Sequence, residues 1–264
     1  MASNQKHLID LYGDGTFEDN RASQSRASSM EFHYTKKCIE PYMNADSIVA
    51  EIGCATGYYA MYFADKCKQY HGFDIVPGNI EVFQQKIRDR KLDNVKAKVG
   101  DATDLHMLGD NHFDIVLVLG PMYHLPPGER AMVMRESTRI CKAGGIIACA
   151  YINKAGAYLQ ACLEYKEIYP NLDTNEYVLG KGTDDQRPDV FYFTMPEEMA
   201  QTAASSGLEV LRNVGVDFIF NPEYINNMPP DRFDAWMELS DLMCESESCT
   251  GLSNHALLVC KKPV

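Results

Sequence analysis

Short apolar runs alternate with helix-like segments between residues 48 and 152, and this alternation limits the possible folds more than any other feature of the chain. The runs at 113–118 and 146–152 contain almost no polar residue. Strands of this kind are typical of a sheet that is covered on both faces. Strands that alternate with helices build βαβ units, which give a mostly parallel sheet. We therefore predict an α/β, doubly wound, Rossmann-like fold.

The helix-like segments carry recognisable start and stop signals. We expect Asn79 to cap the helix that follows the second strand, because a side-chain oxygen there can accept from the first free backbone N–H groups. A later helix is expected to begin after Pro126 and to end at Gly144. Thr194 and Glu197 predict a capping box at the start of another helix.

Two segments depart from the regular alternation. Residues 1–47 are polar and helix-prone in their second half, and we predict that they form an N-terminal helical lid. Residues 153–190 are rich in tyrosine and loop formers, which predicts a substrate-cap insertion within a main domain at 48–264. Two more strands and a helix between them are expected at 208–220, 255–262 and 229–246.

Charge and cysteine content restrict the partners and the compartment. The formal net charge is −12, which disfavours nucleic acid or an anionic membrane, because both are bound mainly by Lys and Arg. Nine cysteines occur with no paired CxxC spacing, so we expect reduced thiols and neither a disulfide framework nor a metal site. The N-terminal stretch lacks the apolar core of a signal peptide, and the run at 146–152 is too short to span a bilayer. These features predict a soluble, cytoplasmic protein.

A glycine-containing turn follows the first apolar strand. The chain runs through Glu51, Gly53 and Gly57 into a helical pattern, and glycines at such a turn usually let a ligand approach the backbone closely. Acidic residues follow the next two strands, at Asp74 and Asp101. Ligands of open parallel sheets bind beyond the carboxyl ends of the strands. We therefore predict a ligand site at this edge.

The spacing of the glycines argues against a dinucleotide. A dinucleotide site has the pattern G-x-G-x-x-G, but here Ala55 replaces the middle glycine and Tyr58 the third. Glu51 would repel a pyrophosphate, whereas it suits a ligand that carries an amino group and a sulfonium. Asp74 suits ribose hydroxyls in either case. Asp101 can accept a hydrogen bond from an adenine amine.

Several stretches resemble one enzyme family. This chain resembles class I S-adenosylmethionine-dependent methyltransferases in five stretches, which occur in the same order as in the family. They are "VAEIGCATGYYA", "GFDIV", "VGDATDL", "FDIVLVLGPMYHL" and "KAGGIIACAYI". The steps "LGPMYHL", "FYFTMPEEM" and "SNHALLVCKK" resemble a bacterial small-molecule, methyltransferase type 11-like branch. The resemblance implies a seven-stranded sheet with one antiparallel strand near the edge.

The resemblance also implies a cofactor and the residues that hold it. S-adenosyl-L-methionine is the expected cofactor, and S-adenosyl-L-homocysteine is its product. Ala55 departs from the glycine that is commoner in the family. If the N-terminal segment closes as a lid, Arg21 or Arg26 is expected to reach the cofactor carboxylate. The predicted cofactor set is Glu51, Gly53, Cys54, Ala55, Gly57, Asp74, Ile75, Asp101, Ala102, Leu119 and Arg26.

Candidates for the chemistry follow the fourth strand. Gly120 and Pro121 force a turn there, so Tyr123 and His124 are expected to face the cleft. His124 is the first candidate for a base, because the unperturbed pKa of histidine lies near neutrality. The alternative is that Tyr123 packs under the loop while His124 caps the next helix.

The predicted function is methyl transfer from S-adenosylmethionine to a small acceptor at oxygen, nitrogen or sulfur. The tyrosines of 153–190 favour an aromatic or flat apolar acceptor. Three alternatives stay open: a protein or RNA methyltransferase, an NAD(P)-dependent oxidoreductase, and a non-catalytic S-adenosylmethionine-binding protein. The residues indicate no oligomeric state.

Overall fold

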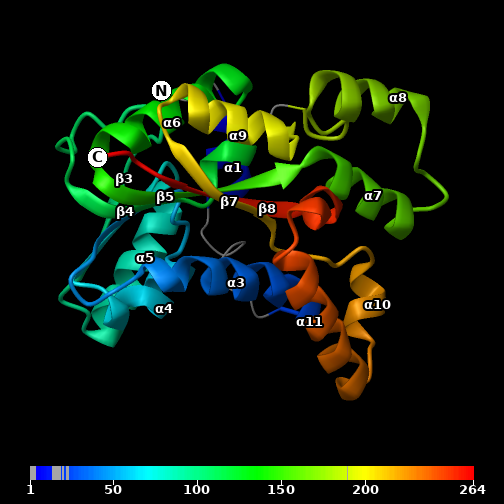
Figure 1. Cartoon of the computed structure of the whole chain (residues 1–264), viewed down its shortest axis with the longest axis horizontal. Helices are drawn as coiled ribbons and strands as arrows, with labels where there is room; N and C mark the ends of the chain where they lie inside the picture. Colours follow the sequence, from blue (N-terminus) through cyan, green and yellow to red (C-terminus); the bar gives the residue numbers. More distant parts are fainter. Residues whose placement is uncertain (1–3, 14–18, 20, 22–23, 189) are drawn as a thin grey trace.

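A computed structural model describes residues 4–13, 19, 21, 24–188 and 190–264 (Figure 1). One mixed sheet runs through the molecule in the order β3-β2-β1-β4-β5-β8-β7, and the short β6 pairs with the end of β5. Among the strands of the described residues, β8 alone runs antiparallel to the rest of the sheet, between its neighbours β5 and β7. The predicted α/β, doubly wound sheet with one antiparallel strand near the edge is confirmed, and β6 adds an eighth strand to the seven that were predicted. The strands are β1 Ile48–Ile52, β2 Gln69–Asp74, β3 Val95–Val99, β4 Phe113–Val118, β5 Cys141–Asn153, β6 Phe193–Thr194, β7 Glu209–Gly215 and β8 His255–Lys261.

Helices cover both faces of the sheet (Figure 1). One layer contains α3, α4, α5 and α11, and the other contains α6 and α9. The helices are α1 Gln5–Tyr12, α3 Arg26–Ile39, α4 Tyr58–Phe63, α5 Pro77–Arg90, α6 Pro127–Ile140, α7 Lys154–Glu164, α8 Leu172–Asn175, α9 Pro196–Ser205, α10 Pro222–Asn226 and α11 Pro230–Cys244. No helix in the described part of the chain is both long enough and apolar enough to cross a membrane.

The apolar strands bury alternate residues in two cores. Val49 of β1 packs into the core that contains Phe63 and Phe83, on the side of α4 and α5. Its neighbour Ala50 packs into the other core, which contains Val133 of α6. Because successive strand residues point to opposite faces, a strand covered on both sides must be apolar at nearly every position. This explains the almost continuous apolar runs in the sequence.

Two helix boundaries differ from expectation. Helix α5 begins at Pro77, after the cap residue Val76, because proline at the first helical position needs no N–H partner. Asn79 therefore lies inside the helix and does not cap it. Helix α6 ends at Ile140, so Gly144 lies within β5.

The capping box of α9 is shifted by one residue from the predicted pair. The box joins Met195 and Glu198: Glu198 Oε2 accepts from the Met195 N–H over 3.0 Å and from the Thr194 hydroxyl over 2.8 Å. Glu197 lies in the first turn and is not part of the box.

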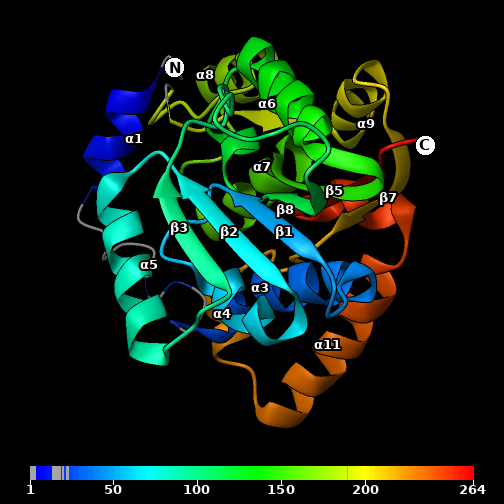
Figure 2. The same cartoon turned by 90° about the vertical axis from the view of Figure 1, so that its left-hand side faces the viewer.

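The N-terminal segment contributes to the core as well as to the ligand site. Helix α3 buries Met30 and Tyr34, and the Tyr34 hydroxyl donates to the Met237 carbonyl of α11 over 3.0 Å. Helix α1 lies instead beside the arrowheads of β2 and β3 (Figure 2). Of the predicted lid at 1–47, residues 1–3, 14–18, 20 and 22–23 lie outside the described residues. The insertion at 153–190 contains α7, α8 and a π-helical turn at Glu176–Lys181.

Candidate functional site

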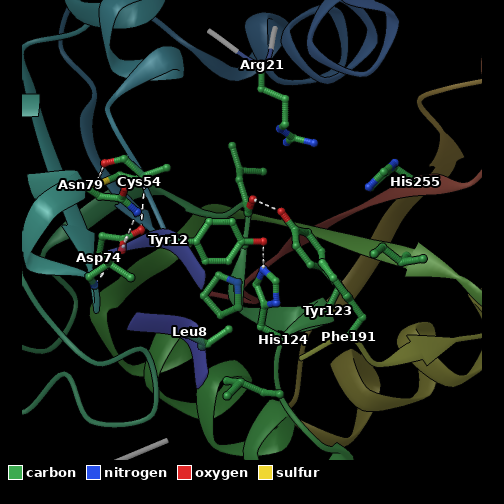
Figure 3. Close-up of a pocket in the computed structure, with 18 of the residues that line it drawn as sticks. Leu8, Tyr12, Arg21, Cys54, Asp74, Asn79, Tyr123, His124, Phe191 and His255 are labelled. Carbon is green, nitrogen blue, oxygen red and sulfur yellow. Dashed lines mark hydrogen bonds between the residues drawn. The ribbon is translucent and has the colours of Figure 1, made fainter. Parts of the chain in front are cut away.

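A cavity of about 550 Å³ opens at the carboxyl edge of the parallel strands (Figure 3). The turn after β1 and the ends of β2, β3 and β4 line one end of it. Helix α7 and the start of β8 line the other end, and helix α1 contributes Tyr12, which lies between Asp74 and His124 in Figure 3. This volume lies within the range of small-molecule sites, and the two differently lined ends provide space for two ligands side by side.

The turn after β1 has a left-handed backbone at three alternate residues. Gly53, Ala55 and Gly57 have φ values of 78°, 43° and 82°. A Cβ on Gly53 would lie 2.5 Å from Cδ of Pro121, and a Cβ on Gly57 would lie 2.3 Å from the Phe83 ring. Gly53 is thus required by the close approach of the Gly120–Pro121 loop, and Gly57 by helix packing. The positive φ of Ala55 is unusual for a residue with a Cβ.

Asp74 holds this turn against the end of β2. Its Oδ2 accepts from the Ala55 N–H over 2.9 Å, and its Oδ1 accepts from the Val76 N–H over 2.9 Å. Burial raises the pKa of the Asp74 carboxyl, while these hydrogen bonds oppose the rise. Asn79 also donates to Oδ1, at 3.4 Å. Within the described part of the chain, the buried Oδ1 of Asn79 has no hydrogen-bond partner.

Glu51 lies at the floor of the same end. It is 1% exposed, and its Oε2 accepts from the Tyr70 hydroxyl over 2.8 Å. Burial raises the pKa of its carboxyl to about 8. The group is therefore mostly neutral at pH 7 until a cation is brought beside it.

The structure brings together nine of the predicted cofactor residues but not the other two. Gly57 packs against Phe83 and does not line the cavity. Arg26 points away from the cavity: its guanidinium donates to the Met228 carbonyl and lies 4.9 Å from the centre of the Phe233 ring. The residues that do line it are Glu51, Gly53, Cys54, Ala55, Asp74, Ile75, Asp101, Ala102 and Leu119.

Arg21 lines the cavity where Arg26 does not. Its guanidinium forms an ion pair with Glu31 at 3.1 Å and lies 5.0 Å from the centre of the Phe32 ring. Figure 3 shows Arg21 reaching into the cavity toward Tyr123.

Both catalytic candidates line the cavity, and each is held by hydrogen bonds. The Tyr123 hydroxyl donates to the Leu119 carbonyl over 3.1 Å. His124 Nδ1 lies 2.8 Å from the Val190 carbonyl, which can only accept, so we assign the proton to Nδ1. Nε2 lies 3.4 Å from the Tyr12 hydroxyl of α1. Burial lowers the pKa of His124 to about 4, so the ring is neutral at pH 7.

The tyrosines of the insertion differ in their environment. Tyr165 lines the cavity. Tyr158 instead exchanges hydrogen bonds with the backbone of Asn171 and packs edge-on to Tyr169. The Lys181 ammonium nitrogen lies over the Tyr177 ring, 3.9 Å from the ring centre. Phe191 and Phe193, at the end of the insertion, add apolar surface to the cavity.

Sequence reasoning missed His255, which lines the cavity and pairs with a buried acid. His255 Nδ1 lies 2.6 Å from Asp217 Oδ2. His255 pairs with Ile152 of β5, so the first residue of β8 lies at the edge where the parallel strands end. The resemblance predicts one antiparallel strand near the edge, and assigning that direction to the strand at 255–262 would have placed His255 at the site.

A family model described as a methyltransferase domain matches residues 49–145. This stretch covers the glycine turn, the acids after β2 and β3, and the loop with Tyr123 and His124. It ends before α7 and the start of β8, which line the other end of the cavity.

Curated relatives match part of the chain. A tRNA U34 carboxymethyltransferase of Aliarcobacter butzleri (strain RM4018) is 37% identical over 91 residues, which cover 33% of this chain and 29% of the relative. Methyltransferase GfsG of Streptomyces halstedii is 31% identical over 134 residues, covering 50% and 47%. A demethylmenaquinone methyltransferase of Geobacillus sp. (strain WCH70) is 28% identical over 102 residues, covering 38% and 42%. The chain thus matches less than half the length of each of these relatives.

Solved structures share the fold over the whole chain. The [4+2]-cyclase SpnF superimposes with a TM-score of 0.65 at 18% identity, covering 100% of this chain and 98% of its own. A structure of the Haloferax volcanii Trm112 methyltransferase activator in complex with the putative methyltransferase gives a TM-score of 0.63 at 17% identity, covering 97% and 96%. At these identities the likeness concerns the fold alone.

Proposed function

We propose that this chain is a class I S-adenosylmethionine-dependent methyltransferase and that its cavity performs methyl transfer to a small acceptor. The match of residues 49–145 to a methyltransferase-domain model supports the proposal. One observation carries the proposal. The cavity joins the glycine turn and the strand-end acids to a second, aromatic-lined end without a break. Transfer between two molecules needs both reacting groups in one water-poor space.

The residues of the first end fit S-adenosylmethionine. The cofactor has ribose hydroxyls that donate, and the Asp74 carboxylate and the partnerless Asn79 Oδ1 are buried acceptors in the lining. Its adenine amine suits Asp101, which already accepts from the Thr103 N–H and hydroxyl at 2.9 Å and 2.7 Å. Its amino group is a cation, which suits Glu51. When bound, the cofactor supplies a methyl group on a positively charged sulfonium.

The chain's own residues bind, orient and exclude water. The turn at Gly53 and Ala55 offers backbone to the ligand, and Leu8 of α1 adds an apolar wall. The Leu119 carbonyl holds the Tyr123 phenol, which fixes that ring between the two ends of the cavity. His124 and Tyr123 remain candidates for the chemistry, and the neutral His124 ring offers a lone pair at Nε2.

Cofactor binding is expected to release a proton below pH 8. Glu51 is neutral in this range, and a cationic amino group beside it favours the ionised carboxylate. The affinity for S-adenosylhomocysteine should therefore rise by up to about tenfold per pH unit from pH 6 and level off near pH 8. Calorimetry in two buffers of different ionisation enthalpy measures the released proton. Glu51→Gln should bind without this release; equal wild-type affinities at pH 6 and pH 8 would contradict the prediction.

Binding and transfer assays test the function as a whole. Calorimetry with S-adenosylhomocysteine and with NAD is expected to show binding of the first only. Tritiated methyl transfer from S-adenosylmethionine to a panel of small hydroxyl, amine and thiol acceptors is expected to label at least one of them. Tight binding of NAD alone would support the oxidoreductase alternative instead. Cofactor binding with no labelled acceptor would support a non-catalytic binding protein.

The small-molecule acceptor is favoured by relatives and by charge. GfsG and the demethylmenaquinone methyltransferases are among the relatives, although a tRNA-modifying enzyme is too. The net charge of −12 disfavours RNA. A [4+2]-cyclase shares this fold, so the fold alone does not determine the reaction, and the proposal depends on the residues of the site. The cytoplasmic location stays a prediction, supported by nine free cysteines that all lie in described residues.

A further inference from the structure

We propose that His255, oriented by Asp217, removes the proton from a hydroxyl group on an aromatic acceptor. This inference rests on the proposed methyl transfer. It adds to that function the residue that receives the proton and the chemical class of the acceptor.

The two residues form a rigid pair. Asp217 is 1% exposed. Its Oδ2 lies 2.6 Å from His255 Nδ1, and its Oδ1 accepts from the His255 N–H at 2.7 Å and from the Ser253 hydroxyl at 2.8 Å. Both carboxylate oxygens are thus engaged, which fixes the plane of the imidazole. A carboxylate on Nδ1 places the proton there, so the neutral ring carries its lone pair on Nε2.

The pair lies at the acceptor end of the cavity. Figure 3 shows His255 and Arg21 reaching into the same part of the cavity as the Tyr123 ring. The His255 side chain is 17% exposed, and among the described residues its side-chain hydrogen bonds use Nδ1 alone. Nε2 is therefore available to a ligand. The Tyr123 ring lies edge-on at 6.1 Å between ring centres, and Phe32 and Phe193 line the same cavity. These aromatic side chains favour a flat acceptor.

The charges around His255 favour its protonated form after transfer. Burial acts to lower its pKa, but the carboxylates of Glu31 and Asp217 outweigh burial and raise the pKa to about 9. Arg21 opposes them with its positive charge, and the Tyr123 phenol is a further titratable neighbour. A base of this strength matches an aromatic hydroxyl, whose unperturbed pKa is about 10 in tyrosine.

His124 is less suited to the same task. Its Nδ1 donates to the Val190 carbonyl, which adds no negative charge beside the ring. The Tyr12 hydroxyl lies near its Nε2, and its pKa is lowered to about 4. An imidazole with that pKa holds a proton poorly at pH 7. We therefore assign His124 to positioning and His255 to the proton.

In the proposed step a proton passes to His255 and a methyl group passes to the acceptor oxygen. The O–H bond of the acceptor breaks, and its proton forms an N–H bond with Nε2 of neutral His255. The oxygen uses an electron pair to bond to the methyl carbon, and the bond from that carbon to sulfur breaks with its pair left on sulfur. The positive charge passes from sulfur to the imidazolium, where Asp217 and Glu31 stabilise it.

Three acceptors that share one ring system test the assignment. The probes are 2-naphthol, 2-naphthalenethiol and 2-naphthylamine, with tritiated methyl transfer as the readout. His255→Gln keeps an amide group toward Asp217 but lacks the base. His106→Gln is the matched control, because His106 also pairs with an acid, Asp104, at 2.7 Å, yet is 78% exposed and does not line the cavity.

His255→Gln is expected to lower kcat for 2-naphthol by about 10²- to 10⁴-fold. A thiol ionises at lower pH than the corresponding hydroxyl, so kcat for 2-naphthalenethiol should fall by less than about tenfold. His106→Gln should match the wild type with every probe. Binding of S-adenosylhomocysteine to His255→Gln should stay within about threefold of the wild type.

The pH profile distinguishes proton removal from simple packing. With 2-naphthol, wild-type kcat should rise from pH 7 toward a plateau above about pH 9, because only neutral His255 accepts a proton. Asp217→Asn removes a carboxylate that raises this pKa, so its rise should move to lower pH and its plateau should fall. Ionisation of free 2-naphthol affects all variants alike. If Asp217→Asn does not fold, the probe comparison with His255→Gln decides alone.

Several results would overturn the inference. These are no wild-type transfer to 2-naphthol, at least one third of wild-type kcat in His255→Gln, or equal losses for 2-naphthol and 2-naphthalenethiol. Transfer to the thiol or amine but not to 2-naphthol refutes this inference and leaves the proposed function standing. Failure to label any acceptor of the wider panel refutes the proposed function itself.

Discussion

Replacing Asp74 with alanine is expected to weaken the binding of S-adenosylhomocysteine by at least about 100-fold. The carboxylate accepts from the Ala55 and Val76 N–H groups at 2.9 Å each, so the variant loses one of the contacts that hold the turn against β2, while the Gly53 and Cys54 N–H groups still donate to the Phe73 carbonyl. Each buried N–H left without an acceptor costs about 1–3 kcal/mol. One of the two acceptors proposed for the ribose hydroxyls, the Asp74 carboxylate, is lost as well. Calorimetry measures the affinity, and thermal unfolding should show a lower Tm.

Two further variants separate the causes of this loss. Asp74→Asn keeps one oxygen and should fall between alanine and the wild type. Asp89→Ala, an exposed acid on the same α5, should change neither affinity nor Tm. An Asp74→Ala protein that binds S-adenosylhomocysteine within threefold of the wild type would contradict the proposed cofactor site.

Replacing Gly156 with alanine is expected to displace α7 and destabilise the acceptor end of the cavity. A Cβ there would lie 1.9 Å from the Ser253 carbonyl oxygen and 2.4 Å from its carbon, and both are backbone atoms that cannot rotate away. Overpacking of this kind costs about 1–3 kcal/mol, which lowers Tm by about 2–12 °C in a chain of this size. Ser253 also donates to Asp217, so the shift should reach the pair with His255.

The expected result of this substitution is a split between the two ends of the cavity. Methyl transfer should fall by at least about tenfold, whereas affinity for S-adenosylhomocysteine should change by less than about threefold. Gly128→Ala in α6 is the matched control, since a Cβ there meets no atom within 4 Å. Its Tm should stay the same or rise slightly. Unchanged Tm and unchanged transfer in Gly156→Ala would show that α7 does not depend on this close packing.

The sheet and the cofactor end of the cavity could be predicted because they depend on local patterns. Gly53 directly follows β1, Asp74 ends β2, and Asp101 lies two residues beyond β3. The carboxyl ends of parallel strands share one edge, so residues at those ends must meet. His255 was missed because the same rule, applied to carboxyl ends only, overlooks the start of an antiparallel strand. The pairing of Ile152 with His255 places that start at the same edge.

The choice between the two arginines could not be made from spacing. Arg26 is the first residue of α3, and the helix directs it toward Met228 and Phe233. Arg21 precedes the helix and forms an ion pair with Glu31. This pair depends on how α3 packs on the sheet, so the sequence alone does not predict it. Side-chain direction at the start of a helix depends on tertiary packing, which the order of residues alone does not reveal.

The contacts of His124 tie together three stretches that are far apart in the chain. Its ring meets Tyr12 of α1 and the Val190 carbonyl, and its own carbonyl accepts from the Asn4 side chain. For protein engineers this makes the N-terminal helix, the turn after β4 and the loop before β6 a single module. A chimaera that takes the loop before β6 from a related enzyme without the matching N-terminal helix would remove the contact between the His124 ring and the residue at position 12. Recombination between related enzymes should therefore move all three stretches as a block.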